Sequence, residues 1–350
     1  MISESNHVFI IAEAGSNWRL GTPERDIRMA KSLIDVASDS GADAIKFQTY
    51  RSKTVYVPNA GSVEYLSKKG ITQPITKIFD DLSMPYEMIP ELSEYCISKN
   101  IEFMSTPFSI DDAKAIDPYV NFHKIASSEI THSRLIEFLA KTRKPVIFST
   151  GASDMNDIQW AIEHFRKHGG KQIILLQTTM QYPAPLENLN LSAMLDLKNK
   201  FNIPIGFSDH SIEPLIGPII ATAFGATVIE KHFTLNKKLP GPDNSFALEP
   251  NELKNMVLAI RNSKKCIGEN KKIILNDENS YRNFSQRSIQ CISKIKKGDI
   301  FCEGKNIDIL RSGSQRKGLH PKFLEFIEGK LSLREIPIGD GIMDDDYENI

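Results

Sequence analysis

Two histidines, His210 and His232, occupy matching positions in the chain. Each closely follows a short apolar run of strand length, at 203–207 and 226–229, and one apolar helical segment separates the two runs. A right-handed crossover makes such strands parallel neighbours, so both imidazoles are expected at the same edge of a sheet. Two imidazoles side by side can hold one divalent metal ion and leave most of its coordination sphere open to substrate. The spacing therefore predicts a catalytic metal site.

Neither histidine supports this inference alone. A single histidine at a strand end is more often a hydrogen-bonded structural residue than a metal ligand. Two histidines at matching positions favour ligation, and a carboxylate lies beside each of them. Asp209 immediately precedes the first histidine, and Glu230 lies two residues before the second. Either carboxylate can orient an imidazole or contact a substrate.

Polar residues also follow the other strand-like runs of the chain. They are Glu13, Asn17, Lys46, Gln48, Ser105, Thr106, Lys124, Ser127, Glu129, Ser149, Thr150, Gln177, Thr178, Tyr182 and Ser208. Taken singly, each hydroxyl is more often a turn or capping residue, and a lysine at a strand end is usually solvated. Two lysines and several hydroxyls beside a histidine pair indicate a site for phosphate or carboxylate, because these anions bind best to charge-assisted donors.

The elements that must position these residues alternate between apolar runs of strand length and amphipathic helical stretches. The runs lie at 8–14, 44–47, 101–104, 120–125, 145–148, 173–176, 203–207 and 226–229. Eight strand–helix units in about 265 residues match the number and length of a (β/α)8 TIM barrel. The runs are apolar throughout, as expected when both faces of a strand are buried. An open doubly wound sheet is the main rival, but Gly15-Ser16-Asn17 lacks the glycine-rich phosphate turn of that fold.

Three further segments complete the chain. An insertion rich in Thr, Ser, Lys and Gly occupies 50–84, between the second strand and its helix. Residues 269–286 are polar without a clear period and are expected to be a linker after the barrel of residues 1–268. Residues 287–350 contain short apolar alternations broken by glycine turns, which predict a small β-rich domain. A domain of about 65 residues is marginally stable alone, so it is expected to pack against a partner surface.

Composition excludes several classes of protein. The chain has 350 residues, of which 25% are charged and 41% hydrophobic, as in ordinary soluble proteins. A net charge of −1 gives no electrostatic basis for binding nucleic acid. The apolar stretch 216–229 is too short and too interrupted to span a membrane. The amino terminus resembles no signal peptide, and the four cysteines show no metal-type spacing, so a reduced, cytoplasmic protein is expected.

Nine short motifs stand in order at the ends of the expected strands. They are FIIAEAGSN, AIKFQTY, FMSTPF, HKIASSE, IFSTGAS, QYPAP, IGFSDHS, IEKHFTL and GPDNSFALEP. Together they resemble the motifs of the sialic acid synthases, which make N-acetylneuraminate and its relatives legionaminate and pseudaminate. The later segment RSIQCISKIKKGDIF resembles the start of the antifreeze-like (SAF) domain that these enzymes carry. The resemblance covers nearly the whole chain.

The resemblance implies a reaction between phosphoenolpyruvate and an open-chain N-acylated hexosamine such as N-acetylmannosamine. C3 of phosphoenolpyruvate adds to the sugar aldehyde, water attacks C2, and phosphate leaves with C–O cleavage. The product is a nine-carbon 2-keto-3-deoxy acid. The resemblance also implies a divalent metal on His210 and His232. Manganese is the expected ion, with cobalt and magnesium as alternatives.

Further site residues are carried over from the matching motifs. The implied phosphoenolpyruvate ligands are Lys46, Thr106, Lys124, Ser127, Ser149 and Ser208. The residues implied to face the sugar are Gln48, Tyr182, Glu230 and Asp243, and the expected catalytic residues are His210, His232, Glu230 and Tyr182. Arg311 matches a cation that the family's C-terminal domain places in the site of a neighbouring subunit. The resemblance therefore implies a domain-swapped homodimer.

The chain departs from the family pattern at the sugar end. Asn17-Trp18-Arg19-Leu20-Gly21 is one residue longer than the usual Asn-His-x-Gly. It has Trp18 in place of the histidine, and no carboxylate follows where some members have a catalytic glutamate. Met180 stands where many members have asparagine, and 313–318 is longer and more basic than usual. These differences leave open which sugar is used and which group transfers protons.

Two other interpretations remain at this stage. The first is a related barrel synthase or aldolase acting on another aldose, including a phosphorylated one. Arg19, Arg316 and Lys317 would then be extra cations for the phosphate, although such loop charges are as often simply solvated. The second is an inactive paralogue whose C-terminal domain binds a sugar or a partner. The intact histidine pair and the two lysines argue against this second interpretation.

Overall fold

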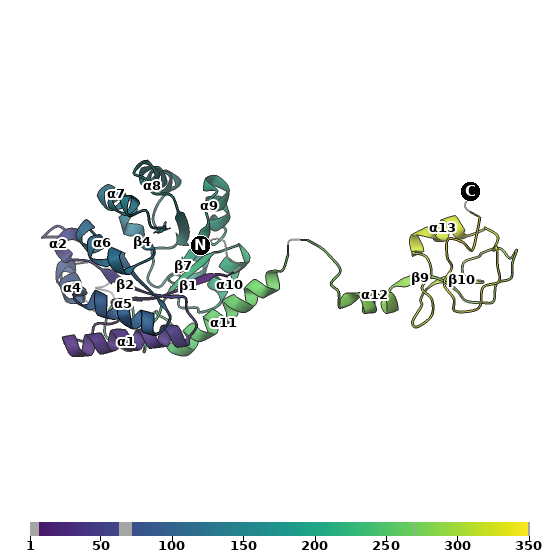
Figure 1. The fold of residues 1–350 in the computed structure, drawn as a ribbon, viewed down its shortest axis with the longest axis horizontal. Helices are drawn as coiled ribbons and strands as arrows, with labels where there is room; N and C mark the ends of the chain where they lie inside the picture. The colour runs from purple at the N-terminus through teal and green to yellow at the C-terminus, as the bar shows by residue number, and fades with distance from the viewer. Residues whose placement is uncertain (1–6, 63–71, 270, 349–350) are drawn as a thin grey trace. The chain divides into compact units, whose positions relative to one another are not determined.

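The computed structural model of the protein describes residues 7–62, 72–269 and 271–348. The chain forms two compact units, Met1–Gly268 and Glu269–Ile350, each with its own hydrophobic core (Figure 1). Among the described residues, no helix combines the length and apolar character needed to cross a membrane.

The first unit contains one sheet of eight parallel strands. The strands are β1 (Phe9–Gly15), β2 (Ala44–Thr49), β3 (Glu102–Pro107), β4 (His123–Ile125), β5 (Val146–Ser149), β6 (Ile173–Thr178), β7 (Ile205–Asp209) and β8 (Val228–His232). Their hydrogen-bonded order is β3-β2-β1-β8-β7-β6-β5-β4, and β3 packs beside β4 to close the ring. The predicted (β/α)8 barrel is therefore confirmed.

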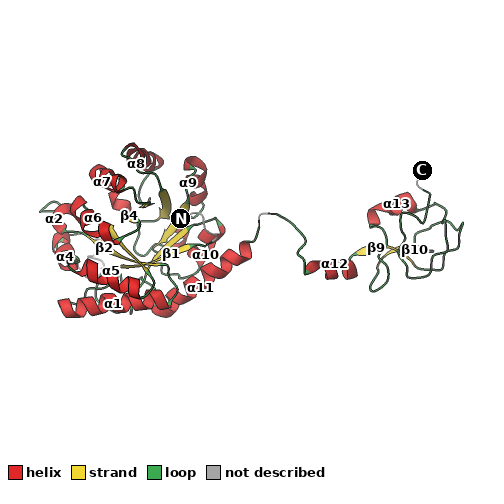
Figure 2. Ribbon diagram, in the orientation of Figure 1, coloured by secondary structure: helices red, strands yellow, loops and turns green. Residues whose placement is uncertain are grey.

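Helices follow the strands and surround the sheet (Figure 2). The main helices are α1 (Pro23–Asp39), α5 (Met88–Ser98), α6 (Ile110–Ile116), α7 (Ser133–Thr142), α8 (Met155–Lys167), α9 (Ala193–Phe201), α10 (Ile216–Ala223) and α11 (Pro250–Ile267). Short 3-10 helices occupy Asp117–Tyr119, Ser127–Glu129 and Leu186–Asn188. Both α1 and α11 begin with proline. Proline suits the first helical position, because the backbone N–H that it lacks would have no partner within the helix there.

Helix α10 begins at Ile216, the second residue after Pro214. The carboxylate of Glu213 accepts hydrogen bonds from the backbone N–H groups of Leu215 (2.8 Å) and Ile216. This acceptor satisfies the first turn, and Pro218 lies within that turn, where its missing N–H costs nothing.

Within its described residues, the predicted insertion contains the short helices α2 (Ser52–Val55) and α4 (Ile75–Leu82). Ile75 and Ile78 are buried against Tyr56 and Phe79, which gives this segment a small core of its own. Residues 63–71 of the insertion lie outside the described residues.

Two apolar clusters build the barrel. The larger one lies between the strands and the helices, and it includes Leu33, Phe148 and Phe207. The smaller one fills the lumen and consists of Ile11, Ala44, Met104, Ile147, Ile174, Leu176 and Val228. Successive side chains of a strand alternate between these clusters, so both faces of the sheet are buried.

His123, the first residue of β4, is a buried histidine held by an acidic partner. Its Nε2 lies 2.9 Å from Asp117 Oδ1, and Lys144 Nζ lies 2.9 Å from the same oxygen. Burial lowers the pKa of the His123 imidazole below its usual 6.5, although Asp117 opposes the shift. The folded protein therefore keeps this side chain neutral to a lower pH than the unfolded chain does.

We expect the free energy of unfolding to fall as the pH drops below about 6.5, because the unfolded chain then binds a proton at His123 that the folded chain does not. Above that pH the residue is neutral in both states and has no effect. The loss approaches about 1.4 kcal/mol per pH unit until the folded pKa is reached. Urea unfolding from about pH 7.5 to about pH 5.5 should show a steeper decline for the wild type than for His123→Gln. Equal slopes would contradict the assignment.

The second unit is built around an antiparallel pair, β9 (Arg287–Cys291) and β10 (Ile307–Arg311). Isolated bridges such as Ile295–Ile336 extend the pairing beyond these strands. A 3-10 helix (Pro321–Phe323) and α13 (Leu324–Ile327) follow. The buried core includes Ile289, Phe301 and Tyr347. The prediction of a small β-rich domain is confirmed.

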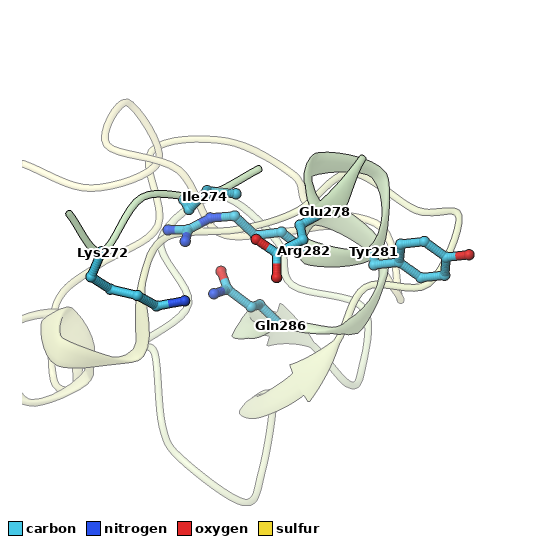
Figure 3. Close-up of a pocket in the computed structure, with 6 residues that line it drawn as sticks. All are labelled: Lys272, Ile274, Glu278, Tyr281, Arg282 and Gln286. Atoms are coloured by element: carbon cyan, nitrogen blue, oxygen red, sulfur yellow. The ribbon is translucent and has the colours of Figure 1, made fainter. Parts of the chain in front are cut away.

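The segment predicted as a linker is not irregular throughout, because it contains helix α12 (Glu278–Ser285). Lys317 Nζ donates to Gln286 Oε1 at 3.1 Å and connects the end of this helix to the β-rich domain. The helix and the residues before it line an open groove of about 520 Å³ (Figure 3). The groove is lined by Lys272, Ile274, Glu278, Tyr281, Arg282 and Gln286.

Candidate active site

The barrel lumen changes from apolar to polar toward the carboxyl ends of the strands. On β1 the residue two positions after Ile11 is Glu13, and on β8 Val228 is followed at the same spacing by Glu230 and His232. The polar residues line a pocket of about 60 Å³. Its lining is Glu13, Lys46, Gln48, Thr106, Phe108, Lys124, Ala126, Ser127, Ser149, Thr178, Tyr182, Ser208, His210, Glu230 and His232. Active sites of such barrels lie at this end of the strands.

The two histidines lie together in this pocket. Their ring centroids are 5.6 Å apart, and each side chain is almost fully buried. His210 Nδ1 donates to the backbone oxygen of Thr179 at 2.8 Å, so Nε2 carries the lone pair. Burial lowers the pKa of His210 to about 4, and it lowers the pKa of His232 well below 6.5. Both rings are therefore neutral, as metal ligands must be.

The pair satisfies further requirements of a metal site. The bond from His210 to a backbone carbonyl is the kind of outer contact that orients a metal-binding imidazole. His232 Nδ1 is buried without a hydrogen-bond partner in the described part of the chain, and Asp243 Oδ2 lies 3.9 Å away. No group of three or more His, Cys, Asp and Glu side chains within the described residues is placed to hold a metal ion. The two histidines thus leave room for substrate or water as other ligands.

Lys124, Ser127 and Ser149 form one side of the pocket. Lys124 Nζ donates to Ser149 Oγ (2.7 Å) and to the backbone oxygen of Ile125 (2.9 Å). Burial lowers the pKa of Lys124 to about 8. Ser127 Oγ accepts from the N–H of Gly151 at 3.0 Å, and a Cβ at position 151 would lie only 2.9 Å from that oxygen. The glycine therefore permits the close approach of these two strand ends.

Lys46 lies at the centre of a second group of contacts. It forms an ion pair with Glu13, donates to Thr106 Oγ1 at 3.0 Å, and lies 3.7 Å from Glu230 Oε1. Burial opposes the charge of Lys46, but the two carboxylates outweigh it and raise its pKa. Glu13 also accepts from Gln48 Nε2 at 2.9 Å, which connects the lysine and the amide through one carboxyl group.

The two carboxyl groups of the pocket differ in their ionisation. Burial raises the pKa of Glu13 to about 7, although Lys46 opposes the shift. Burial also disfavours the charge of Glu230, but Lys46 and Lys124 outweigh it and hold the pKa of Glu230 below its usual value. Ser208 Oγ donates to Glu230 Oε1 at 3.0 Å and adds to this effect.

Aromatic rings border the histidine pair. The ring of Tyr182 lies 4.3 Å from that of His210, and the ring of Phe246 lies 5.2 Å from that of His232. Met180 is near this wall, since its Cγ would lie 2.9 Å from a Cβ at position 151. Arg311 is different, because it is an exposed residue at the end of β10 in the second unit. The pocket of the first unit is built without it.

Four charged residues considered as possible site residues from the sequence are bound by other side chains instead. Asp209 points away from the pocket and binds Lys231 Nζ at 2.6 Å, because strand alternation directs it outward from β7. Arg19 is bound by Asp26 (2.6 Å) and Asp81 (2.9 Å). The other two candidate phosphate cations are also engaged within their own unit, since Arg316 pairs with Asp340 at 2.8 Å and Lys317 donates to Gln286.

Trp18 is not a pocket residue either. Its side chain is 1% exposed and belongs to the core between the strands and the helices. The position where the family has histidine is therefore used here for packing.

Glu13 and Phe246 have roles in the site that the sequence alone did not predict. Glu13 pairs in register with Lys46 on β2 and with His232 on β8. Aligning β1 with its neighbouring strands by their polar ends would have placed this carboxyl group between the predicted anion ligands and the predicted metal ligands. Phe246 lies in the loop after β8, and no sequence pattern indicates its contact with His232.

The fold and the pocket define a TIM barrel with lysine and hydroxyl donors beside a histidine pair. A family model described as the NeuB family matches residues 33–272. The spore coat polysaccharide biosynthesis protein SpsE of Bacillus subtilis is 39% identical over 97% of this chain and 93% of its own length. The pseudaminic acid synthase of Campylobacter jejuni is 35% identical over 97% of this chain and 96% of its own length.

A solved structure gives the same result. The N-acetylneuraminic acid (sialic acid) synthetase of Leptospira borgpetersenii, in complex with citrate, is 34% identical and has a TM-score of 0.69. The match covers 79% of this chain and 92% of that protein. The chain belongs to the NeuB family and is an enzyme of the acid-synthase class.

Proposed function

We propose that this enzyme condenses phosphoenolpyruvate with an open-chain N-acylated hexosamine to give a nine-carbon 2-keto-3-deoxy acid and phosphate. The observation that carries the proposal is the placement of two buried lysines, four hydroxyls and two neutral histidines in one pocket. Relatives named for the synthesis of pseudaminic and N-acetylneuraminic acid support the product class.

In this proposal the anionic substrate binds to the lysines and hydroxyls. Lys124 has three N–H donors, of which two are bound to Ser149 and to a backbone oxygen, so the third is available to phosphate or carboxylate. Lys46, Thr106, Ser127 and Ser208 complete the set. Burial strengthens each of these charge-assisted hydrogen bonds, because water does not compete for the donors.

The sugar is proposed to bind next to the anion and the histidines. Gln48, Glu230 and Asp243 offer polar atoms for its hydroxyl and acylamino groups, and Tyr182 supplies an aromatic surface. His210 and His232 would hold a divalent ion, with manganese as the proposed metal. When bound, such an ion polarises a carbonyl oxygen. The tight pocket holds the two substrates in contact and limits access of bulk water.

We also propose a homodimer in which Arg311 of one subunit completes the site of the other, as the family resemblance implies. The exposed position of Arg311 at the end of β10 fits a cation that acts outside its own unit. The cytoplasm is the proposed compartment.

The test is phosphate release from phosphoenolpyruvate, measured with manganese and a panel of aldoses. Release with N-acylated mannosamine-type sugars supports the proposal. Release only with phosphorylated aldoses would favour the alternative synthase, and no release with any sugar would favour an inactive paralogue. The engagement of Arg19, Arg316 and Lys317 by other residues makes the phosphorylated sugar the weaker alternative.

Lys124→Met should weaken the apparent affinity for phosphoenolpyruvate by about 1.5–3 kcal/mol, the scale of a hydrogen bond to a charged group. Its hydrogen-bond partners are uncharged and Glu230 keeps Lys46, so the fold should lose less stability than in Lys46→Met. Lys46→Met should weaken binding similarly and also destabilise the fold by about 3–5 kcal/mol, because it leaves Glu13 buried without its ion-pair partner and Glu230 with Lys124 alone as a counter-charge. Steady-state kinetics and urea unfolding measure the two effects.

A double variant separates binding from stability at Lys46. Adding Glu13→Gln to Lys46→Met removes the carboxylate that has lost its ion-pair partner, so part of the lost stability should return while binding stays weak. If both lysine variants keep the wild-type affinity for phosphoenolpyruvate, the anion site lies elsewhere.

A further inference from the structure

Glu230 occupies the part of the pocket where donors for an anion converge. Its Oε1 accepts from Ser208 Oγ at 3.0 Å and lies 3.7 Å from Lys46 Nζ. The residue is 5% exposed, so these contacts are shielded from water. Ser208 and Lys46 are two of the residues proposed above to bind phosphoenolpyruvate. The carboxylate of Glu230 therefore holds donors that an incoming anion needs.

The other oxygen of Glu230 is unsatisfied. Oε2 is buried and has no hydrogen-bond partner among the described residues. A buried acceptor without a donor costs free energy, because it has given up its bond to water. The present position of the side chain thus satisfies one oxygen at the expense of the other, and a hydroxyl donor in the pocket would remove that cost.

Charge prevents Glu230 and a substrate anion from sharing these donors. Lys46 already faces two carboxyl groups, those of Glu13 and Glu230. A substrate anion would be a third negative group on the same ammonium, and such groups repel each other strongly in a buried site. Lys46 would still be positioned after an exchange of partners, because Glu13 and Thr106 bind it independently of Glu230.

We propose that Glu230 is the internal counter-anion of the empty site, displaced from Ser208 and Lys46 by phosphoenolpyruvate and then free to accept from hydroxyls of the sugar. This inference rests on the proposed function. The step exchanges one hydrogen-bond acceptor for another and changes no covalent bond. It couples the two substrates, since the anion releases the group that binds the sugar, and such coupling is reciprocal.

The test is the affinity of Glu230→Gln for phosphoenolpyruvate in the absence of sugar, measured by isothermal titration calorimetry on the full chain with saturating manganese. The amide keeps the size of the side chain and can still accept from Ser208, but it removes the charge that competes for Lys46. The dissociation constant should fall by about tenfold or more, although turnover with the sugar should be lost. A residue that only binds sugar would leave the dissociation constant unchanged.

Glu129→Gln is the matched control. Glu129 is a partly buried carboxyl at the end of the 3-10 helix Ser127–Glu129, and it bonds to Ser128 instead of Lys46. Its loss removes the same charge from the same end of the barrel, and affinity should change by less than about twofold. An equal fall of the dissociation constant in both variants would overturn the inference, because a general change of the electrostatic potential in the barrel would then explain the result.

Other outcomes are equally distinct. Unchanged or weaker binding by Glu230→Gln, with measurable binding by the wild type, would overturn the role of Glu230 and leave the proposed function intact. No binding of phosphoenolpyruvate by the wild type would instead contradict the proposed function. If circular dichroism shows that Glu230→Gln is unfolded, Glu230→Ala removes the same charge and is expected to tighten binding in the same way.

Discussion

Replacing His210 or His232 with alanine is expected to abolish metal-dependent turnover and to leave the barrel folded. Each change removes one of only two protein ligands proposed for the ion. Loss of an outer-shell partner already costs about 10–100-fold in metal affinity or activity, so loss of a direct ligand should cost more than about 100-fold. The fold should survive, because both side chains line the pocket and lie outside the apolar clusters of the barrel.

Metal content gives a readout that does not depend on activity. After chelation and return of manganese, the two variants should retain far less metal than the wild type by mass spectrometry. His123→Gln is the matched control, since it removes a buried histidine outside the pocket and should leave metal content unchanged. Near-normal activity and metal content in either alanine variant would contradict the two-histidine site.

Much of the barrel could be predicted because its strands are buried on both faces. The run 173–176 is apolar throughout, since one side faces the lumen and the other faces the helices. The observed strand β6 continues to Thr178, and β8 continues to His232. The hydrophobic pattern could not locate these strand ends, because the polar pocket residues at the ends still pair with the neighbouring strands.

The part of the pocket that the strand ends form could be predicted from the sequence. Alternation places Glu230 and His232 on one face of β8 and Lys231 on the other, and the same rule applied to β7 would have directed Asp209 away from the pocket. The role of Glu13 depends on the register of β1 against β2 and β8. The pairing of β1 with β8 joins the two ends of the barrel sequence, so this register follows from comparing strand ends that lie far apart in the chain and not from a local pattern.

Loop charges were harder to interpret than strand residues. Arg19 reads as a free cation in the sequence, but Asp26 and Asp81 bind it from two different segments. Helix α12 was missed because its helical stretch is polar and short, and none of its described residues is buried. In both cases the outcome depends on contacts between loops, which residue types alone do not fix.

A mixed dimer should recover about half of the wild-type activity when one subunit carries Arg311→Ala and the other carries His210→Ala. If Arg311 serves the neighbouring subunit, both changes fall in the same site and the second site is intact, as closed two-fold symmetry requires. Each parent homodimer should be inactive, because every site in it lacks one essential group. Differently tagged subunits, purified as verified heterodimers, allow phosphate release to be measured directly.

Arg316→Ala provides the control for changes in the second unit. Arg316 pairs with Asp340 within that unit, so its homodimer should retain near-normal activity. High activity in the Arg311→Ala homodimer would remove that residue from the site altogether. An inactive heterodimer would mean that each second unit serves its own barrel, because in that arrangement each of the two sites contains one of the changes and neither is whole.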